Sequence, residues 1–157
     1  MSAETRFGVV PADTLKSMSG LEFLTAMLEG RLPAPPICEV MDFRAQEVAA
    51  GRVVFIGHPG HRHFNPIGSV HGGYAATLLD SAMGCAVQST LPRGTGYTTL
   101  EFKVHFIRAL GTDSAPVRAE GSVIQSGRRV AVAEARLTDA RGRLCATATT
   151  TCLVFAL

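Results

Sequence analysis

The chain has 157 residues, of which 46% are hydrophobic and 18% are charged, and its formal net charge is +2. This length suits one domain with a core large enough to fold without disulfides or metal ions. The small charge and the lack of any Lys/Arg block argue against a nucleic-acid partner, and no run of about 18 apolar residues offers a membrane span. We therefore expect a soluble, cytoplasmic protein that binds neither nucleic acid nor membrane.

The N-terminal part predicts one helix and a connector. After a loose leader, apolar residues recur at helical spacing from Thr14 and stop at Gly30, a residue that commonly ends helices. Three prolines stiffen the connector from Arg31 to Pro36. We expect residues 1–36 to form an extension of the main domain, residues 37–157. The extension helix could cover the sheet, join an interface or act as a lid.

The main domain predicts two strands, one long helix and four further strands. The first two strands, 37–46 and 51–58, form a hairpin, and a Pro/Gly-rich loop leads to a helix from about Gly72 to Thr90. Apolar and polar residues then alternate after Gly96 with a period of two. Turn residues separate three more strands, at 117–125, 129–138 and 144–155.

An antiparallel sheet wrapped around the one apolar helix satisfies this order, which is an α+β architecture. We expect one sheet face to be lined by Phe102, Val104, Phe106, Val130 and Val132. Four cysteines lack metal-ligand spacing and lie in apolar stretches, so we expect core residues at Cys38, Cys85, Cys145 and Cys152. The sheet covers only part of so apolar a helix, and a second subunit is expected on the remainder.

Asp80 is an anomaly, because its neighbours on the predicted helix are nearly all apolar. At 100° per residue it shares one narrow sector with Gly73, Thr77 and Gly84. Glycines leave the helix surface bare there, so a ligand could lie against the backbone beside the carboxylate. The sequence therefore predicts a cleft with Asp80 as one wall.

The start of the same helix can stabilise a developing oxyanion. The first-turn N–H groups of Gly72 and Gly73 have no helical partner and carry the positive end of the dipole. Asn65 can donate a second hydrogen bond to the same oxygen. Asp80 can then act as a general base toward water or attack a carbonyl itself. These parts suit the hydrolysis of an activated acyl group.

Structural alternatives exist for each part. Asn65 could simply cap a loop, and Asp80 could pair with Lys103 or Arg108. Three histidines, His58, His61 and His63, could bind a metal ion, but no Cys, Asp or Glu lies between Gly51 and Leu79. We expect this loop to be a basic segment near the active site, without a functional metal.

The combination of Asn65, Gly68, His71-Gly72-Gly73 and Asp80 has the form N-x-x-G-x-x-H-G-G-x-x-x-x-x-x-D/E. With it, the chain resembles the hotdog-fold acyl-CoA thioesterases of the phenylacetate-pathway (PaaI-like) and 4-hydroxybenzoyl-CoA thioesterase group, over roughly residues 37–155. The resemblance implies a hotdog fold and hydrolysis of an acyl-CoA thioester to a free acid and coenzyme A.

The resemblance also implies roles for particular residues. The Gly72 N–H and the Asn65 amide would polarise the thioester carbonyl, with Asp80 as general base or nucleophile; the short Asp side chain favours water activation. His71 would help position the thioester or its departing sulfur. Thr99 occupies the place where relatives often carry a Ser or Thr that orients the attacking water.

Further implications concern the substrate and the assembly. We expect substrate contacts at Gly73 and Thr77 and in the turn Gly127-Arg128-Arg129, whose arginines are candidates for the coenzyme A phosphates. The coenzyme A moiety belongs to the substrate, so no separate cofactor is expected. The family forms a homodimer, commonly paired into a homotetramer, and its site lies across the dimer interface.

Other functions stay open at this point. A non-catalytic acyl-CoA-binding protein could use the same fold. A hotdog dehydratase or hydratase is a third option, although those relatives carry differently spaced catalytic motifs. The sequence leaves the acyl group open, because aromatic, medium-chain and branched groups would each fit an apolar pocket.

Overall fold

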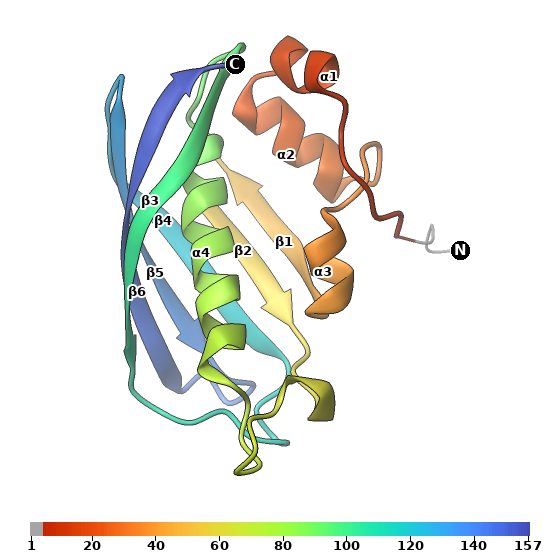
Figure 1. Ribbon diagram of the computed structural model, residues 1–157, viewed down its shortest axis with the longest axis vertical. Helices are drawn as coiled ribbons and strands as arrows, with labels where there is room; N and C mark the ends of the chain where they lie inside the picture. The colour runs from red at the N-terminus through yellow and green to blue at the C-terminus, as the bar shows by residue number, and fades with distance from the viewer. Residues whose placement is uncertain (1–4) are drawn as a thin grey trace.

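The apolar segment predicted as the long helix forms α4 (Gly72–Gln88) in the computed structural model, which describes residues 5–157 (Figure 1). The helix ends two residues before the predicted boundary. The hydroxyl of Ser89 donates to the carbonyl of Ala86, at 2.6 Å, and that of Thr90 donates to Val87, at 2.7 Å. These bonds satisfy carbonyls of the last turn that have no helical partner. No helix within residues 5–157 is long and apolar enough to cross a lipid bilayer.

The strands form one antiparallel sheet in the order β1-β2-β4-β5-β6-β3. Their bounds are β1 Phe43–Ala49, β2 Arg52–Gly57, β3 Thr95–Phe106, β4 Val117–Ser126, β5 Val130–Thr138 and β6 Leu144–Ala156. The sheet curves around one side of α4 and leaves the opposite side of the helix open between β3 and the N-terminal helices (Figure 1). This is the predicted hotdog fold, and the strands from β4 onward lie within one residue of their predicted bounds.

The predicted N-terminal helix is two helices, α1 (Ala12–Ser17) and α2 (Gly20–Leu28). The single-helix prediction is wrong because Ser19 is a helix cap: its hydroxyl accepts from the Glu22 N–H, and the Glu22 carboxylate accepts from the Ser19 N–H. At Gly20 the backbone lies so close to the Gln88 carbonyl that a Cβ would collide with it. The chain therefore turns at Ser19 and packs against the end of α4. The division of the chain at residue 36 stays a prediction.

The first predicted strand begins too early, since residues 36–40 form a short helix, α3 (Pro36–Val40). Pro36 occupies the first helical turn, where its missing N–H costs nothing. Asp42 then adopts a positive φ of 50° and turns the chain into β1. The hairpin from β1 to β2 is confirmed, with Gly51 in the left-handed conformation that its turn requires. A 3₁₀ turn, η1 (His61–His63), interrupts the loop before α4.

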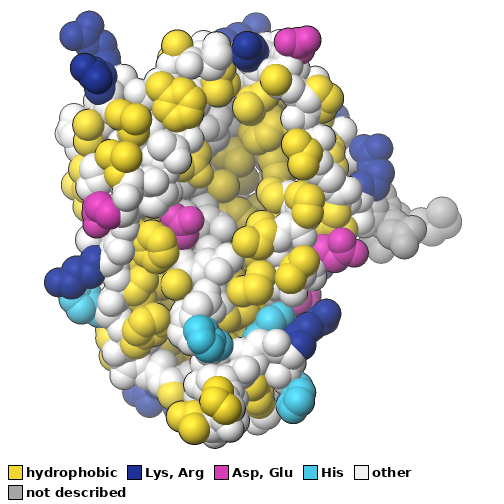
Figure 2. Space-filling view, in the orientation of Figure 1, with side chains coloured by type: hydrophobic (Ala, Val, Ile, Leu, Met, Phe, Trp, Pro, Cys, Tyr) yellow, Lys and Arg dark blue, Asp and Glu magenta, His cyan; other side chains and the backbone are white. Residues whose placement is uncertain are grey.

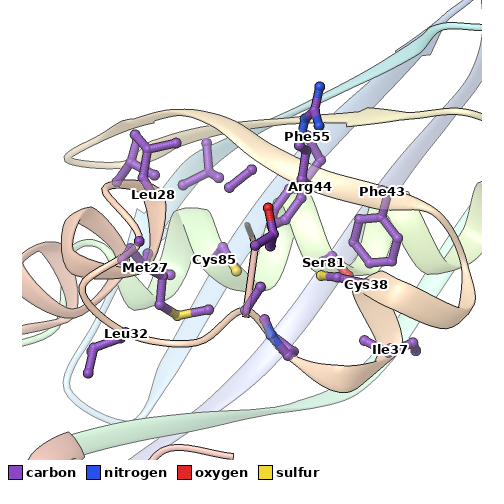
Figure 3. A pocket seen from close by; sticks show the side chains of 18 of the residues that line it. Met27, Leu28, Leu32, Ile37, Cys38, Phe43, Arg44, Phe55, Ser81 and Cys85 are labelled. Atoms are coloured by element: carbon purple, nitrogen blue, oxygen red, sulfur yellow. The ribbon is translucent and has the colours of Figure 1, made fainter. Parts of the chain in front are cut away.

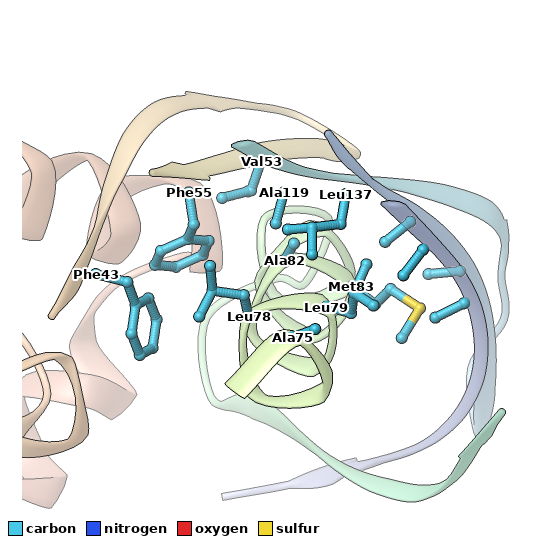
Figure 4. Close-up of a cluster of buried hydrophobic side chains, with 14 of the residues drawn as sticks. Phe43, Val53, Phe55, Ala75, Leu78, Leu79, Ala82, Met83, Ala119 and Leu137 are labelled. Atoms are coloured by element: carbon cyan, nitrogen blue, oxygen red, sulfur yellow. The ribbon is translucent and has the colours of Figure 1, made fainter. Parts of the chain in front are cut away.

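The core lies between α4 and the concave face of the sheet (Figure 4). Leu78, Leu79 and Met83 of α4 are fully buried, as is Leu137 of β5. Burying each such side chain stabilises the fold by roughly 1.5–3 kcal/mol. Small residues let the two surfaces approach: a Cβ at Gly121 of β4 would meet the backbone of Ala82. Three of the four cysteines are buried as predicted, and Cys85 is half-buried.

The predicted apolar face of Phe102, Val104, Phe106, Val130 and Val132 is divided between the two sides of the sheet. By register Phe102, Val104 and Phe106 share the side of Ala133, Ala135 and Leu137, which meets α4, whereas Val130 and Val132 lie on the other side. Leu100 is 57% exposed and Phe106 59% exposed, while on β5 the buried residues are Ala131, Ala133, Ala135 and Leu137 rather than Val130 and Val132. A bulge between Thr99 and Glu101 changes the register of β3 on β6. Alternation predicts a face but cannot say which face meets the helix. As β3 is an edge strand, its exposed face and free edge are open to a partner.

The contact between β4 and α4 makes a test of packing. Replacing Gly121 by Ala should lower the free energy of unfolding by about 2–3 kcal/mol, because the added methyl group would separate sheet and helix. Gly60→Ala is the matched control, since no atom lies within 4 Å of its Cβ position. Urea unfolding at one protein concentration measures both variants. Equal unfolding midpoints would contradict the close approach.

Candidate active site

The loop before α4 is organised around Asn65. Phe64 and Val70 form a bridge at its base, and the Asn65 N–H donates to the Ser69 carbonyl at 2.8 Å. The Asn65 Oδ1 atom accepts from the N–H groups of Ile67, at 3.1 Å, and Ser69, at 3.2 Å. Its Nδ2 donates to the Ser69 hydroxyl at 2.9 Å. Asn65 thus shapes the loop, while one of its two amide hydrogens is left for a ligand.

His71 connects this loop to the helix. Its N–H donates to the His63 carbonyl at 2.8 Å, and its Nδ1 accepts from the Gly73 N–H at 2.8 Å. An accepting Nδ1 leaves the proton of the neutral ring on Nε2. The His71 ring accepts the hydrogen bond of the Gly73 N–H, whereas the Gly72 N–H has no acceptor among residues 5–157. A Cβ at Gly72 would stand 3.1 Å from the Phe106 ring, so glycine permits this approach.

The Asp80 side chain is half-buried on α4 and accepts a hydrogen bond from the edge strand β3. The Thr99 hydroxyl of β3 donates to its Oδ1 at 3.0 Å, which leaves Oδ2 free for another donor. Within residues 5–157 no ion pair joins Asp80 to a Lys or Arg side chain. The alternative in which Asp80 pairs with Lys103 or Arg108 therefore has no support in this subunit. The carboxylate is oriented by one hydroxyl.

The loop and the carboxylate do not converge within one subunit. Asp80 follows Gly72 by eight residues on the same straight helix, which corresponds to about 12 Å along its axis. A carbonyl oxygen bound at the Gly72 N–H is therefore too far from Asp80 for a proton transfer at hydrogen-bond distance. The chain therefore presents two groups of candidate residues at two heights of α4.

The predicted sector around Asp80 is only partly bare. Gly73 is exposed, but the Thr77 hydroxyl donates to the Gly73 carbonyl at 2.8 Å, a bond within the helix. The expectation at Gly84 is wrong, because the Tyr97 ring of β3 fills the space where its Cβ would lie. Burial holds the pKa of Tyr97 well above its ordinary value, so the phenol stays neutral.

An apolar cavity of about 800 Å³ opens beside Asp80, between α4 and the N-terminal helices. Figure 2 shows the corresponding hollow, which hydrophobic side chains border on several sides. Figure 3 shows Met27, Leu28 and Leu32 on one side of the cavity, and Ile37, Cys38 and Phe43 on the other. Asp80, Ser81 and Cys85 of α4 also line it. The sequence predicted a cleft with Asp80 as one wall, but it missed the N-terminal helices that line this cavity and its α4 residues Ser81 and Cys85.

The cysteines at this cavity are not activated nucleophiles. Burial raises the pKa of Cys38 to about 11 and that of Cys85 to about 12. Both thiols are therefore protonated at neutral pH, and the thiolate is the nucleophilic form. Asp80 and Ser81 are the other polar side chains of α4 at the cavity wall.

The arginine turn lies near the opposite end of α4 from the Asn65 loop. The Gly127 N–H donates to the Val130 carbonyl at 2.9 Å, and a Cβ at Gly127 would lie 2.8 Å from that oxygen. Arg128 and Arg129 are both exposed. Ser126, which precedes them, contacts the hydroxyl of Thr90, just beyond the end of α4, at 3.0 Å. Within the chain, the arginine turn and the Asn65 loop therefore lie apart.

The histidines of the loop have separate environments. His63 is buried, its Nδ1 accepts from the Gly60 N–H at 3.0 Å, and its ring centroid lies 4.7 Å from that of Tyr74. His58 and His61 are exposed. Across residues 5–157 no three His, Cys, Asp or Glu side chains converge as a metal ion would require.

Solved structures similar to this one include several thioesterases. A structure from Ralstonia eutropha JMP134, provisionally named a thioesterase related to phenylacetic acid degradation, is 28% identical with a TM-score of 0.75, over 83% of this chain and 98% of that one. A thioesterase family protein from Silicibacter pomeroyi is 25% identical with a TM-score of 0.74, over 85% and 99%. A hypothetical thioesterase from Streptococcus pneumoniae TIGR4, solved with coenzyme A, is 27% identical with a TM-score of 0.66, over 73% and 89%.

Sequence comparison gives a concordant result. A protein of Halobacterium salinarum, provisionally named an esterase, is 42% identical over 69 residues, which cover 43% of this chain. The match spans 44% of that relative, less than half of its length. The family model of the thioesterase superfamily matches residues 67–146, which include His71, Asp80 and Thr99. Because this match covers half of the chain, the protein belongs to the thioesterase superfamily.

Proposed function

We propose that this protein hydrolyses acyl-CoA thioesters to a free acid and coenzyme A. The observation that carries the proposal is the Asp80 carboxylate, which has no cationic partner among residues 5–157, is oriented by Thr99 and borders an apolar cavity. A carboxylate beside an apolar cavity costs free energy unless it is paired or hydrogen-bonded, and Thr99 supplies one hydrogen bond. Membership of the thioesterase superfamily and the coenzyme A bound to the Streptococcus pneumoniae neighbour support this choice of substrate.

In the proposed reaction Asp80 acts as a general base. Thr99 occupies Oδ1, and Oδ2 accepts a proton from water as the water oxygen bonds to the thioester carbon. The carbonyl becomes an oxyanion, and its collapse breaks the carbon–sulfur bond. The proton that Asp80 accepted passes to the departing thiolate, which restores the carboxylate, and the products are a carboxylic acid and a thiol.

The oxyanion would be stabilised by the Gly72 N–H and the second amide hydrogen of Asn65. The first N–H of α4 carries the positive end of the helix dipole, and a donor aimed at a developing oxyanion contributes several kcal/mol to catalysis. The Nε2–H of His71 lies on the same helix end and can donate to the departing sulfur. The exposed Arg128 and Arg129 are our candidates for the coenzyme A phosphates.

We propose further that the site forms between two subunits. The separation of about 12 Å along α4 prevents Gly72 and Asp80 of one chain from acting on one carbonyl. A twofold partner would bring the helix start of one subunit to the carboxylate of the other. The free edge of β3 and the exposed side chains of Leu100 and Phe106 offer the contact surface. A tetramer of such dimers, and a cytoplasmic location, stay predictions.

A non-catalytic acyl-CoA-binding protein is the alternative. It would need the cavity and the oxyanion donors, but it has no need of a carboxylate oriented by Thr99. Hydrolysis therefore has the stronger support. The first experiment below separates the two functions.

Asp80→Asn should lower kcat for acyl-CoA hydrolysis at least about a hundredfold, since the amide cannot accept the proton of water. Thiol release measures the rate, and circular dichroism checks the fold. Asp13→Asn, an exposed position on α1, is the matched control and should retain the wild-type rate. Equal turnover by Asp80→Asn would contradict the proposed base.

Thr99→Val removes the hydroxyl and preserves the shape of the side chain. We expect kcat to fall about tenfold with KM unchanged, because the carboxylate is less well oriented toward water. Thr99→Ser should restore the rate to within about threefold, which a merely structural role of Thr99 would not require. Thr98→Val, at the exposed neighbouring position, is the control. A loss confined to KM would argue against orientation of Asp80.

Complementation tests the shared site. Asp80→Asn and Asn65→Ala should each be inactive as homodimers, whereas a mixed dimer contains one site with both lesions and one intact site. Random mixing should therefore restore about a quarter of the wild-type activity. Mixing Asp80→Asn with Asp80→Ala, which damage the same half, should restore none. No recovery in the first mixture, with subunit exchange verified by mass spectrometry, would place both halves in one subunit.

A further inference from the structure

We infer that the cavity beside Asp80 is an acyl pocket, built partly by the N-terminal helices, and that it selects straight aliphatic acyl groups of roughly eight or more carbons. This inference rests on the proposed thioester hydrolysis and adds the substrate class. The pocket lies between α2, α3, β1 and α4, so the N-terminal extension would determine substrate choice. The helical extension thereby has a role beyond covering the sheet.

The size of the cavity favours a long chain. Its volume is about 800 Å³, in the upper part of the range of roughly 300–1,000 Å³ found for small-molecule pockets. A methylene occupies a volume close to the ~30 Å³ of a water molecule, so a ten-carbon chain needs roughly 300 Å³. An acetyl group or a single aromatic ring would leave much of the cavity without contacts, which forfeits dispersion energy.

The lining favours an aliphatic group over a polar one. Its inner residues are apolar: Leu24, Met27, Leu32, Phe43, Val53 and Phe55. The charged groups at its margin have other partners or face solvent, since Arg6 donates to the Gly30 and Arg31 carbonyls and Glu29 pairs with Arg31. A hydroxylated acyl group that reached beyond Ser81 and Tyr97 would bury its hydroxyl among these apolar side chains without a partner. The amides of the pantetheine arm would meet the same obstacle.

Asp80 gives the cavity its orientation. The carboxylate and its neighbours Ser81 and Cys85 form the α4 wall, whereas the α2 and α3 residues line the sides away from this wall. A thioester carbonyl at Asp80 therefore has an apolar volume into which its acyl chain can extend. Met27 suits a variable chain length, because its unbranched side chain adapts to the space available.

The test is a chain-length profile of kcat/KM for acetyl-, butyryl-, octanoyl-, decanoyl- and phenylacetyl-CoA. For the wild type we expect kcat/KM to rise about fourfold for each added methylene until the cavity is full, following the transfer of CH₂ from water. Met27→Trp should lower the ratio of decanoyl-CoA to acetyl-CoA at least tenfold by filling the cavity. Met18→Trp lies outside the cavity and should leave the profile unchanged.

A second variant, Ile37→Trp, tests the inference in case Met27→Trp does not fold. Ile37 lines the cavity but is 48% exposed, so Ile37→Trp should fold and should also lower the preference for decanoyl-CoA. A preference for phenylacetyl- or acetyl-CoA in the wild type overturns the inference. A profile independent of chain length also overturns it and leaves the cavity to a segment of a partner subunit. Chain-length profiles of kcat/KM that stay unchanged in both Met27→Trp and Ile37→Trp would also overturn the inference.

Measurements of acyl-CoA binding test the acyl pocket independently of the proposed hydrolysis. If no acyl-CoA is hydrolysed, the hydrolase proposal fails, and calorimetry with decanoyl-CoA and acetyl-CoA decides the pocket. Decanoyl-CoA bound at least tenfold more tightly, with the difference lost in Met27→Trp, supports the acyl pocket. Equal affinities overturn it. Asp80→Asn allows the same titration if the wild type hydrolyses the ligand.

Discussion

The close approach of strand β4 to helix α4 is the contact on which the rest of the structure depends. At Gly121 the strand backbone nearly touches the helix backbone at Ala82, and any side chain would hold the two apart. This approach lets a single sheet curve around the helix and bury most of its surface. One stripe remains uncovered, and it carries Asp80 together with Thr77 and Cys85. The surface of α4 that a ligand or partner can reach is therefore the surface that holds the Asp80 carboxylate.

Helix geometry then decides how that carboxylate can be used. The Gly72 N–H and the Asp80 carboxylate are fixed to one helix about 12 Å apart along its axis, so no local flexibility can bring them to the same carbonyl. Under the proposed function, a second subunit would supply the missing half more simply than a rearrangement of the core. The N-terminal helices close the other side of the stripe and convert an open groove into an apolar cavity. Assembly would bring the reacting groups together, and the extension would select the substrate.

Patterns of local sequence predicted the parts with strong periodicity or turn chemistry. The bounds of α4 and of the strands from β4 onward follow from hydrophobic periodicity and from the turns at Gly127 and Gly142. The predictions were wrong where the local signal was a single residue, or where the pattern was compatible with either face of a strand. Ser19 capped a second helix inside an apolar run, and Pro36 began a helix where a strand was expected. The alternation in β3 placed Phe106 on the side that meets α4, but Val130 and Val132, which were expected on the same face, lie on the other side of the sheet.

The sequence by itself determined the fold class and the residues of the candidate site, because the spacing from Asn65 to Asp80 and the apolar helix are properties of neighbouring positions. The tertiary structure alone decided which surfaces of that helix stay open. It filled the space at Gly84 with Tyr97, oriented Asp80 through Thr99 and enclosed the cavity with α2 and α3. These contacts join residues far apart in the chain, and periodicity contains no information about which distant side chain fills a given space.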